Sequence, residues 1–557
     1  MAHEIYELSS RMVDEMVALM PTMGTLIGIP GFDDRWNDFS PAGAEAEAAL
    51  FRDQLARVRA LPASGDRWDR LAVRVAEEWL LDRLVWYDGD EHLRELNSMA
   101  SPLQDMREIF DHMARGTVEA WENVAARLEG LPTAMGQYRT MLEAGRHRGM
   151  AVARRQVVEV IRQARHSAGD RSFFDSLTAE LAEEGTGDAR LVGRVAAGAA
   201  LARRVYGDIA DYLESTYLPS AVERDGVGEE RYVRLATRYL GDGLDPHAAY
   251  RWGWTEVARI RARMEAVASE ILPGGDLRSV LDLLRQDPQR AAHSQEEFRE
   301  LMQHRLEAAL VDLQGSHFDV PEPIRRVDVK MAPPGGALGA YYVAPSEDFT
   351  RPGTVWWSKG DKQELPLFDE VSTAYHEGFP GHHLQNGLQM LAGDRVTRLQ
   401  KLVVWYSGSG EGWALYAEDL MDELGYLDKP DYVMGKLASE MLRACRVVID
   451  IGSHLELPIP QDQPFHPGEA WSFETGVEML DDYAAQDHDI AVSEMHRYLG
   501  WPGQAIAYKI GQQAIRDLRD EERSAKGAAY DEKGFHARLL EIGSTGLRVM
   551  REHMREG

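Results

Sequence analysis

Three histidines and a glutamate lie within eight residues, in the segment His376-Glu377-Gly378-Phe379-Pro380-Gly381-His382-His383. Catalytic zinc sites are built from such donors: imidazoles and a carboxylate, with a further position left open for water. A second glutamate beside the site can take the proton of that water. His376 and Glu377 supply the first half of the usual H-E-x-x-H pattern. The segment therefore predicts a Zn²⁺ site in which His376 is a ligand and Glu377 the catalytic base.

The second histidine ligand cannot stand at its usual place, because Pro380 occupies the position four residues after His376. On a straight helix the i+6 position points about 240° away from i, and the i+7 position lies about 10.5 Å along the axis. A break is therefore required, and the ring of Pro380 provides one because it clashes with the carbonyl of His376. If two residues bulge out of the helix, His382 returns to the i+4 position relative to His376, whereas His383 reaches that position only if three residues bulge out. We expect His382 to be the second ligand, with His383 as the alternative.

The third ligand should be a carboxylate on another helix. Glu411 follows the flexible segment 407–410 and begins an apolar, helical run. Glu418 lies two turns later on the same face. It is therefore predicted to be either a group that orients a metal ligand or an ordinary surface residue. Glu411 is the expected ligand; the alternative is that it only compensates the dipole at the start of its helix.

Hydrolysis of an amide creates an oxyanion that needs hydrogen-bond donors besides the metal. Tyr508 and His454 are the candidates for this role. Arg446, Asp450 and His454 recur every four residues, so they share one helix face. This spacing indicates either an exposed row of ion pairs or a His454 that points into the cleft, with Asp450 orienting it or a zinc-bound histidine.

Four further residues are candidates for substrate binding. Arg497 is predicted to pair with a substrate carboxylate, because a guanidinium binds a carboxylate through two parallel hydrogen bonds. Tyr498 follows it directly, and Tyr341 and Tyr342 lie on a β-prone run from which they could line the cleft. An edge strand there could also pair with an extended peptide. All four could equally be packing or surface residues.

The elements that must position these residues are mainly helices. Apolar residues recur at three- and four-residue spacing up to about residue 320, as in residues 254–267. Loop signals and short β-prone runs at residues 327–329, 340–343 and 354–357 predict a small sheet of two to four strands. We expect a mainly α protein with a helical lobe at 1–320, a β element at 321–360 and a helical catalytic region at 361–557, which together form one continuous two-lobed unit.

Composition excludes several classes of protein. The net charge of −30 and the lack of a basic run argue against nucleic-acid binding and against anionic membrane surfaces. The only cysteine, Cys445, cannot form an internal disulfide and is expected in the core. Neither a signal peptide nor an apolar run long enough to span a membrane is visible. We expect a cytoplasmic protein; nothing indicates its oligomeric state.

Several stretches resemble a known family. The segment 376–385 is similar to the HExxPGHH signature of the bacterial "domain of unknown function 885" proteins, which look like distant relatives of thermolysin-clan (gluzincin) metallopeptidases. Other matching stretches are 339–342, 411–414, 443–454, 497–498 and 501–508. The resemblance implies a large helical fold with a deep active-site cleft beside the small sheet. Many relatives are exported lipoproteins.

These observations favour a zinc metallopeptidase that hydrolyses short peptides through a metal-activated water. The first alternative is a zinc hydrolase of a non-peptide amide or ester, because the same chemistry serves both. The second alternative is a non-catalytic helical binding protein with a structural metal. Glu377 argues against the latter, since a structural site has no use for a base.

Overall fold

The computed structural model describes residues 4–170, 172–332, 339–346, 349–358 and 364–556. Helices make up most of this chain, which confirms the mainly α fold class. The described chain divides into two compact units, one of Met1–Ala63, Ala76–Gly228 and Ser493–Pro502, the other of Ser64–Val75, Glu229–Val492 and Gly503–Gly557. None of the described helices is both long and apolar enough to cross a membrane.

The first unit is organised around long amphipathic helices. In α6, the buried residues Trp121, Val124, Leu128, Leu131 and Met135 recur at alternating three- and four-residue spacing, so they form one apolar stripe. This stripe packs against α9. The helices of this unit are α1 (Glu4–Leu19), α2 (Pro21–Leu26), α3 (Pro41–Arg59), α5 (Pro102–Glu108), α6 (Val118–His147), α7 (Arg154–Ala168), α8 (Phe173–Glu184) and α9 (Ala189–Tyr212). Two helices, α4 (Arg67–Asp88) and α20 (His488–Gly500), contribute residues to both units.

The second unit has two buried helices at its centre, α17 and α18. Residues 412–421 of α17 and 444–452 of α18 are buried on every side, which is typical of helices inside a core. The helices of this unit are α10 (Glu229–Leu240), α11 (Pro246–Ile271), α12 (Leu277–Gln286), α13 (Gln295–Leu313), α14 (Glu370–Glu377), α15 (His382–Leu391), α16 (Arg398–Leu402), α17 (Ser407–Glu423), α18 (Pro430–Leu455), α19 (Phe473–Asp482), α21 (Ala507–Lys526), α22 (Glu532–Glu541) and α23 (Leu547–Glu556). Cys445 is buried in α18, as expected.

Helix α17 packs directly on α21 because glycines line their crossing. A Cβ atom on Gly412 would lie 2.5 Å from the backbone carbon of Gly511, and one on Gly511 would lie 1.7 Å from the carbonyl oxygen of Gly408. The two backbones therefore touch, which places the start of α17 against the start of α21.

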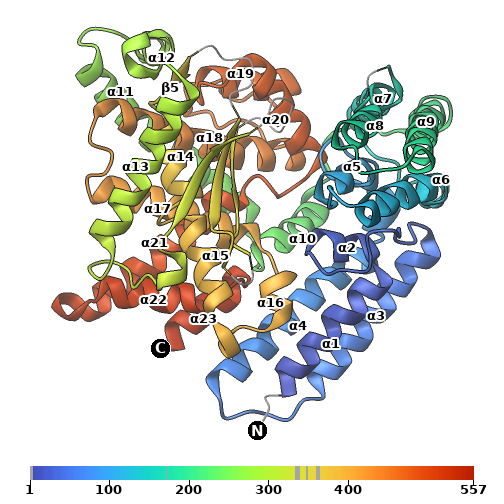
Figure 1. Ribbon diagram of the computed structural model, residues 1–557. Helices are drawn as coiled ribbons and strands as arrows, with labels where there is room; N and C mark the ends of the chain where they lie inside the picture. The colour runs from blue at the N-terminus through green and yellow to red at the C-terminus, as the bar shows by residue number, and fades with distance from the viewer. Residues whose placement is uncertain (1–3, 171, 333–338, 347–348, 359–363, 557) are drawn as a thin grey trace. The chain divides into compact units, whose positions relative to one another are not determined.

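A three-stranded sheet lies beside α13 and α14 in the second unit (Figure 1). Its strands are β2 (Val327–Met331), β3 (Gly339–Val343) and β4 (Gly353–Ser358), in the order β2-β4-β3. β4 runs parallel to β2 and antiparallel to β3, with Tyr341 opposite Trp356. A second pair joins β1 (Ala291–Ala292) to β5 (Leu365–Pro366). The β element predicted at 321–360 thus contains all three strands of the larger sheet.

The predicted boundary at residue 320 does not separate compact units. Helices α10–α13 precede it and belong to the same unit as the metal motif. The sheet needs α13 as a cover: Gln303 of α13 donates to Val327 O (2.9 Å) and accepts from Val329 N (2.8 Å). The ring of Phe298 packs edge-on against Trp357. The change of unit that precedes α10 lies instead at residues 228–229.

Candidate metal centre

The metal motif spans the junction of two short helices. α14 ends at Glu377 and α15 begins at His382, and the Phe379–Pro380 peptide between them is cis. Two backbone hydrogen bonds close the junction: Gly381 N donates to Tyr375 O (3.0 Å) and His383 N to Gly378 O (3.1 Å). The break expected at residues 378–381 is present, and it is complete: it separates two helices where a bulge within one helix was also conceivable.

Gly381 and Trp413 hold this break in shape. A Cβ atom on Gly381 would lie 1.9 Å from the carbonyl oxygen of His376, so only glycine fits. The indole Nε1 of Trp413, in α17, donates to Pro380 O (3.0 Å) and also approaches Gly381 O (3.3 Å). The helix that carries Glu411 therefore fixes the segment that separates the two histidines.

His376, His382 and Glu411 converge at the spacing that a metal requires. Glu411 Oε2 lies 3.4 Å from His376 Nε2 and 3.6 Å from His382 Nε2. The imidazole rings are perpendicular, with centroids 5.0 Å apart. Ligand atoms on a tetrahedral zinc, at about 2.1 Å from the ion, lie roughly 3.4 Å from one another. Among the residues described, these three form a group able to hold a metal ion, with all ligand atoms within 4.8 Å.

The remaining hydrogen bonds decide which histidines can serve as ligands. Glu418 accepts from His376 Nδ1 (2.9 Å), which leaves Nε2 facing Glu411. His383 has both nitrogens engaged, since Nε2 donates to Ile324 O (2.9 Å) and Nδ1 accepts from the Tyr342 hydroxyl (3.1 Å). The geometry therefore favours His382 over His383 as the second ligand.

Carboxylates near the histidines set the electrostatics of the site. Burial lowers the pKa of His376, but hydrogen bonds to Glu411 and Glu418 outweigh it and raise the pKa to about 10. Burial opposes the charge on Glu411, yet its two histidine neighbours hold its pKa well below the usual range. Burial raises the pKa of Glu377, whereas the positive charges of His376 and His382 act to lower it. The donor set thus favours a positive charge at its centre.

The three ligands and Glu377 open onto a pocket of about 460 Å³ within the second unit. The pocket also contains the predicted site residues Tyr341, Tyr342 and Tyr508. Sequence reasoning did not place five further lining residues there: Ala344, Asn386, Trp405, Arg443 and Arg446. For Arg446, the only signal in the sequence is its position one turn before Asp450, in the row for which both an exposed set of ion pairs and a His454 in the cleft were open.

The structure does not place His454 in this pocket. Its side chain has no exposed surface, its Nε2 lies 3.6 Å from Asp450 Oδ1, and its ring packs on Tyr232. Tyr232 also donates to Asp450 Oδ2 (2.6 Å). Both expectations for the Arg446–His454 row are corrected, because Asp450 and His454 are buried against α10 and are neither exposed nor in the cleft.

Arg497 and Tyr498 belong to the part of α20 assigned to the first unit. Arg497 Nη1 lies 3.1 Å from Glu494 Oε1, and the Tyr498 hydroxyl donates to Glu494 Oε2 (2.5 Å). Both side chains therefore share a carboxylate on their own helix, and their role in substrate binding stays a prediction.

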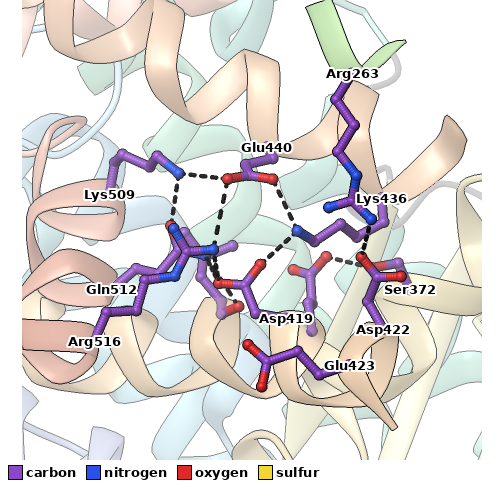
Figure 2. A network of polar contacts seen from close by, with 12 residues as sticks. Arg263, Ser372, Asp419, Asp422, Glu423, Lys436, Glu440, Lys509, Gln512 and Arg516 are labelled. Carbon is purple, nitrogen blue, oxygen red and sulfur yellow. Dashed lines mark hydrogen bonds and ion pairs between the residues drawn. The ribbon is translucent and has the colours of Figure 1, made fainter. Parts of the chain in front are cut away.

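A buried network of charges links three helices that also carry pocket residues (Figure 2). Glu440 of α18 is its centre: Lys436 Nζ lies 2.8 Å from Oε2, and Lys509 Nζ, from α21, lies 2.7 Å from Oε1. Lys436 also pairs with Asp419 of α17, to which Gln512 donates (2.6 Å). Together these cations outweigh burial and hold the pKa of Glu440 well below its usual range. The network ties α17, α18 and α21 to one another.

Comparisons with known proteins give the fold and the family. A structure described as "the putative lipoprotein from Colwellia psychrerythraea" is similar with a TM-score of 0.86 at 21% identity, and covers 99% of this chain and 98% of that chain. A "putative lipoprotein of unknown function" from Shewanella oneidensis has a TM-score of 0.77 at 16% identity, with 99% of each chain covered. No curated protein matches. Residues 21–554 match the family described as bacterial protein of unknown function (DUF885), and the chain therefore belongs to the DUF885 family.

Proposed function

We propose that this protein is a zinc-dependent hydrolase that cleaves peptide bonds of short peptides. One observation carries the proposal: His376, His382 and Glu411 meet at metal-ligand spacing on the wall of an open pocket that also contains Glu377. A structural zinc site is normally closed by four protein ligands, whereas a catalytic site keeps one position open. The open pocket therefore supports catalysis over a purely structural metal.

The residues present fit a zinc ion. Two imidazoles and one carboxylate form the His₂Glu donor set used by zinc hydrolases, and Glu418 holds the non-ligating nitrogen of His376 as an orienting carboxylate does. A bound Zn²⁺ would lower the pKa of a water and polarise the carbonyl that is attacked.

Glu377 and Tyr508 are the residues that would act on the substrate. Glu377 accepts a proton from the attacking water and passes it to the leaving amine. Tyr508 lines the same pocket as the ligands and is the residue proposed to donate to the oxyanion. His454 is withdrawn from this role because it is buried elsewhere.

The relationship to gluzincin peptidases and the cytoplasmic location belong to the proposal as well. The first is supported by the spacing of His376, Glu377 and Glu411 and by the orienting Glu418. The second is tested by fractionating cells that express the full chain, since its structural neighbours are described as lipoproteins.

The proposed function is tested by metal analysis combined with a substrate panel. Purified protein should bind one Zn²⁺, and the loaded protein should hydrolyse di- or oligopeptides faster than acyl-amides or esters. Glu377→Gln should keep the zinc and lose turnover by at least about a hundredfold, as expected for removal of a general base. A protein that neither holds nor acquires Zn²⁺, Mn²⁺ or Co²⁺ would refute the proposal. Faster turnover of the non-peptide substrates would support the alternative hydrolase.

A further inference from the structure

Two arginines share the pocket with the metal ligands. Arg443 and Arg446 lie one turn apart on α18 and both line the cavity of about 460 Å³. The chain as a whole carries a net charge of −30, whereas its candidate active site contains two adjacent positive charges. Each repels the other, since the charge of Arg446 contributes to lowering the pKa of Arg443 after burial.

Arg443 forms no ion pair with any described carboxylate. Its Nη1 donates to the backbone oxygen of Ser439 (3.1 Å) and to the Ser439 hydroxyl, and its Nε is buried without a hydrogen-bond partner. A buried guanidinium normally pairs with a carboxylate, because taking the charge out of water costs several kcal/mol. The protein therefore keeps, at the border of the pocket, a largely buried cation that uses only part of its hydrogen-bonding capacity.

Arg446 strengthens the positive potential at the same wall. Its guanidinium lies over the ring of Tyr508, 5.0 Å from the ring centre. Cation–π stacking of this kind holds a guanidinium in a fixed plane. Arg443 is near enough to the site for the charge of Glu411 to act on its pKa. A substrate that reaches the metal ligands therefore meets both arginines.

We propose that Arg443, reinforced by Arg446, binds a carboxylate of the substrate next to the scissile bond. This inference rests on the proposed function and names its substrate class: peptides that end in a free carboxylate shortly after the bond that is cut. A volume of 460 Å³ equals a cube of about 8 Å, and an extended chain advances about 3.3–3.6 Å per residue, so roughly two residues fit. The enzyme then acts as a carboxypeptidase or dipeptidase.

The test compares three peptides. The first two share one sequence and end in a free acid or in an amide; the third is the amide with aspartate as its last residue. The wild-type protein should hydrolyse the free acid with a kcat/KM about 10- to 100-fold above the plain amide, the range expected for a charge-assisted, bidentate hydrogen bond. The aspartyl amide distinguishes a terminal from a side-chain carboxylate. If it is cleaved as well as the free acid, the inferred C-terminal specificity is overturned.

Substitutions then assign the effect to Arg443. Arg443→Gln should lower kcat/KM for the free acid by about 10- to 100-fold and change that for the amide by less than about twofold. Arg443→Lys should recover part of the loss, because it keeps the charge without the planar fork. Arg278→Gln, at an arginine that is 85% exposed, is the matched control and should change neither value. Equal loss on acid and amide in Arg443→Gln overturns the inference.

A binding measurement separates this inference from the proposed function. N-acetyl amino acids and their amides are titrated into the zinc-treated protein by calorimetry, and the acids should bind at least about tenfold more tightly through Arg443. Such binding without hydrolysis of any peptide refutes the peptidase and leaves the carboxylate site standing. Hydrolysis with no preference for the acids, in turnover or binding, leaves the peptidase and overturns the carboxylate site.

Discussion

Replacement of Glu418 tests whether the candidate metal centre works as its geometry suggests. Glu418 does not face the metal position: Oε1 accepts from His376 Nδ1 at 2.9 Å, and Oε2 accepts from the Ser372 hydroxyl. Both contacts are buried, and the side chain of Glu418 is only 4% exposed. Glu418 therefore fixes the tautomer and the direction of the His376 ring without being a ligand. Its removal should weaken metal binding and leave the three ligands in place.

The size of the effect follows from the contact that is lost. Removing the carboxylate partner of a ligating histidine typically costs 10- to 100-fold in metal affinity, which corresponds to about 1.4–2.8 kcal/mol. We expect Glu418→Ala to show a loss in this range. Glu418→Gln should lose less, because the amide oxygen can still accept from Nδ1 but carries no charge. Competition between the protein and a chelating dye for Zn²⁺ at neutral pH measures both values.

The control is Glu423→Gln on the same helix. Glu423 is half exposed and pairs with Arg519 through both oxygens at 2.9 Å, so its loss should alter zinc affinity by less than about twofold. Denaturant titration of each metal-free variant checks that the fold persists. Unchanged zinc affinity in Glu418→Ala, in a folded protein, would refute the orienting role and with it the assignment of His376 Nε2 as the ligand atom.

Four further outcomes follow from the site and its surroundings. His382→Ala should abolish stoichiometric zinc, whereas His383→Ala should retain it, and metal analysis that finds the reverse selects the other ligand. Gly381→Ala should lower the free energy of unfolding by about 1–3 kcal/mol and weaken zinc binding, as measured by denaturation and dye competition. Because the pKa of His376 is raised to about 10, zinc must displace a proton from the metal-free protein at neutral pH. Calorimetry in two buffers should detect the release of about one proton or more, and zinc affinity should fall as the pH falls. Glu440→Gln leaves buried cations uncompensated and should cost about 3–5 kcal/mol of unfolding free energy, and a cost below 1 kcal/mol would contradict the network.

The sequence predicted the metal cluster because its ligands are close in the chain or follow a strong pattern. His376 and His382 are six residues apart, and Pro380 alone shows that a straight helix cannot join them. The choice of His382 over His383 agrees with the hydrogen bonds in the structure, because His383 is engaged on both sides. The sequence of residues 376–383 alone could not show that α14 ends completely before α15 begins. The shape of this junction also depends on Trp413, which lies more than thirty residues later in α17 and donates to Pro380 O.

The remainder of the pocket depends on how helices rotate about their axes in the fold. Arg443 and His454 lie on the same helix, α18, and periodicity alone does not say which of its faces meets the cavity. Arg446, Asp450 and His454 share one face, but the helix is buried on every side from residue 444 to residue 452, so this polar face did not have to be the one that meets the cavity. The spacing of Arg446, Asp450 and His454 suggests either an exposed row or a His454 in the cleft, whereas the structure places Arg443 and Arg446 at the cavity. Only long-range packing carries this information.

We expect the buried charges that link α17, α18 and α21 to help specify that orientation. Three network residues lie beside a pocket or site residue on their own helices: Lys509 follows Tyr508, Asp419 follows Glu418, and Glu440 precedes Arg443 by one turn. Successive helical residues point about 100° apart, so fixing one sets the direction of the next. Buried ion pairs contribute little net stability compared with apolar residues of the same size. We therefore expect that replacing Lys436, Glu440 and Lys509 together by apolar residues preserves the unfolding free energy within about 2 kcal/mol but removes the preference for free-acid peptides, because the rotation of α18 and α21 is then no longer specified.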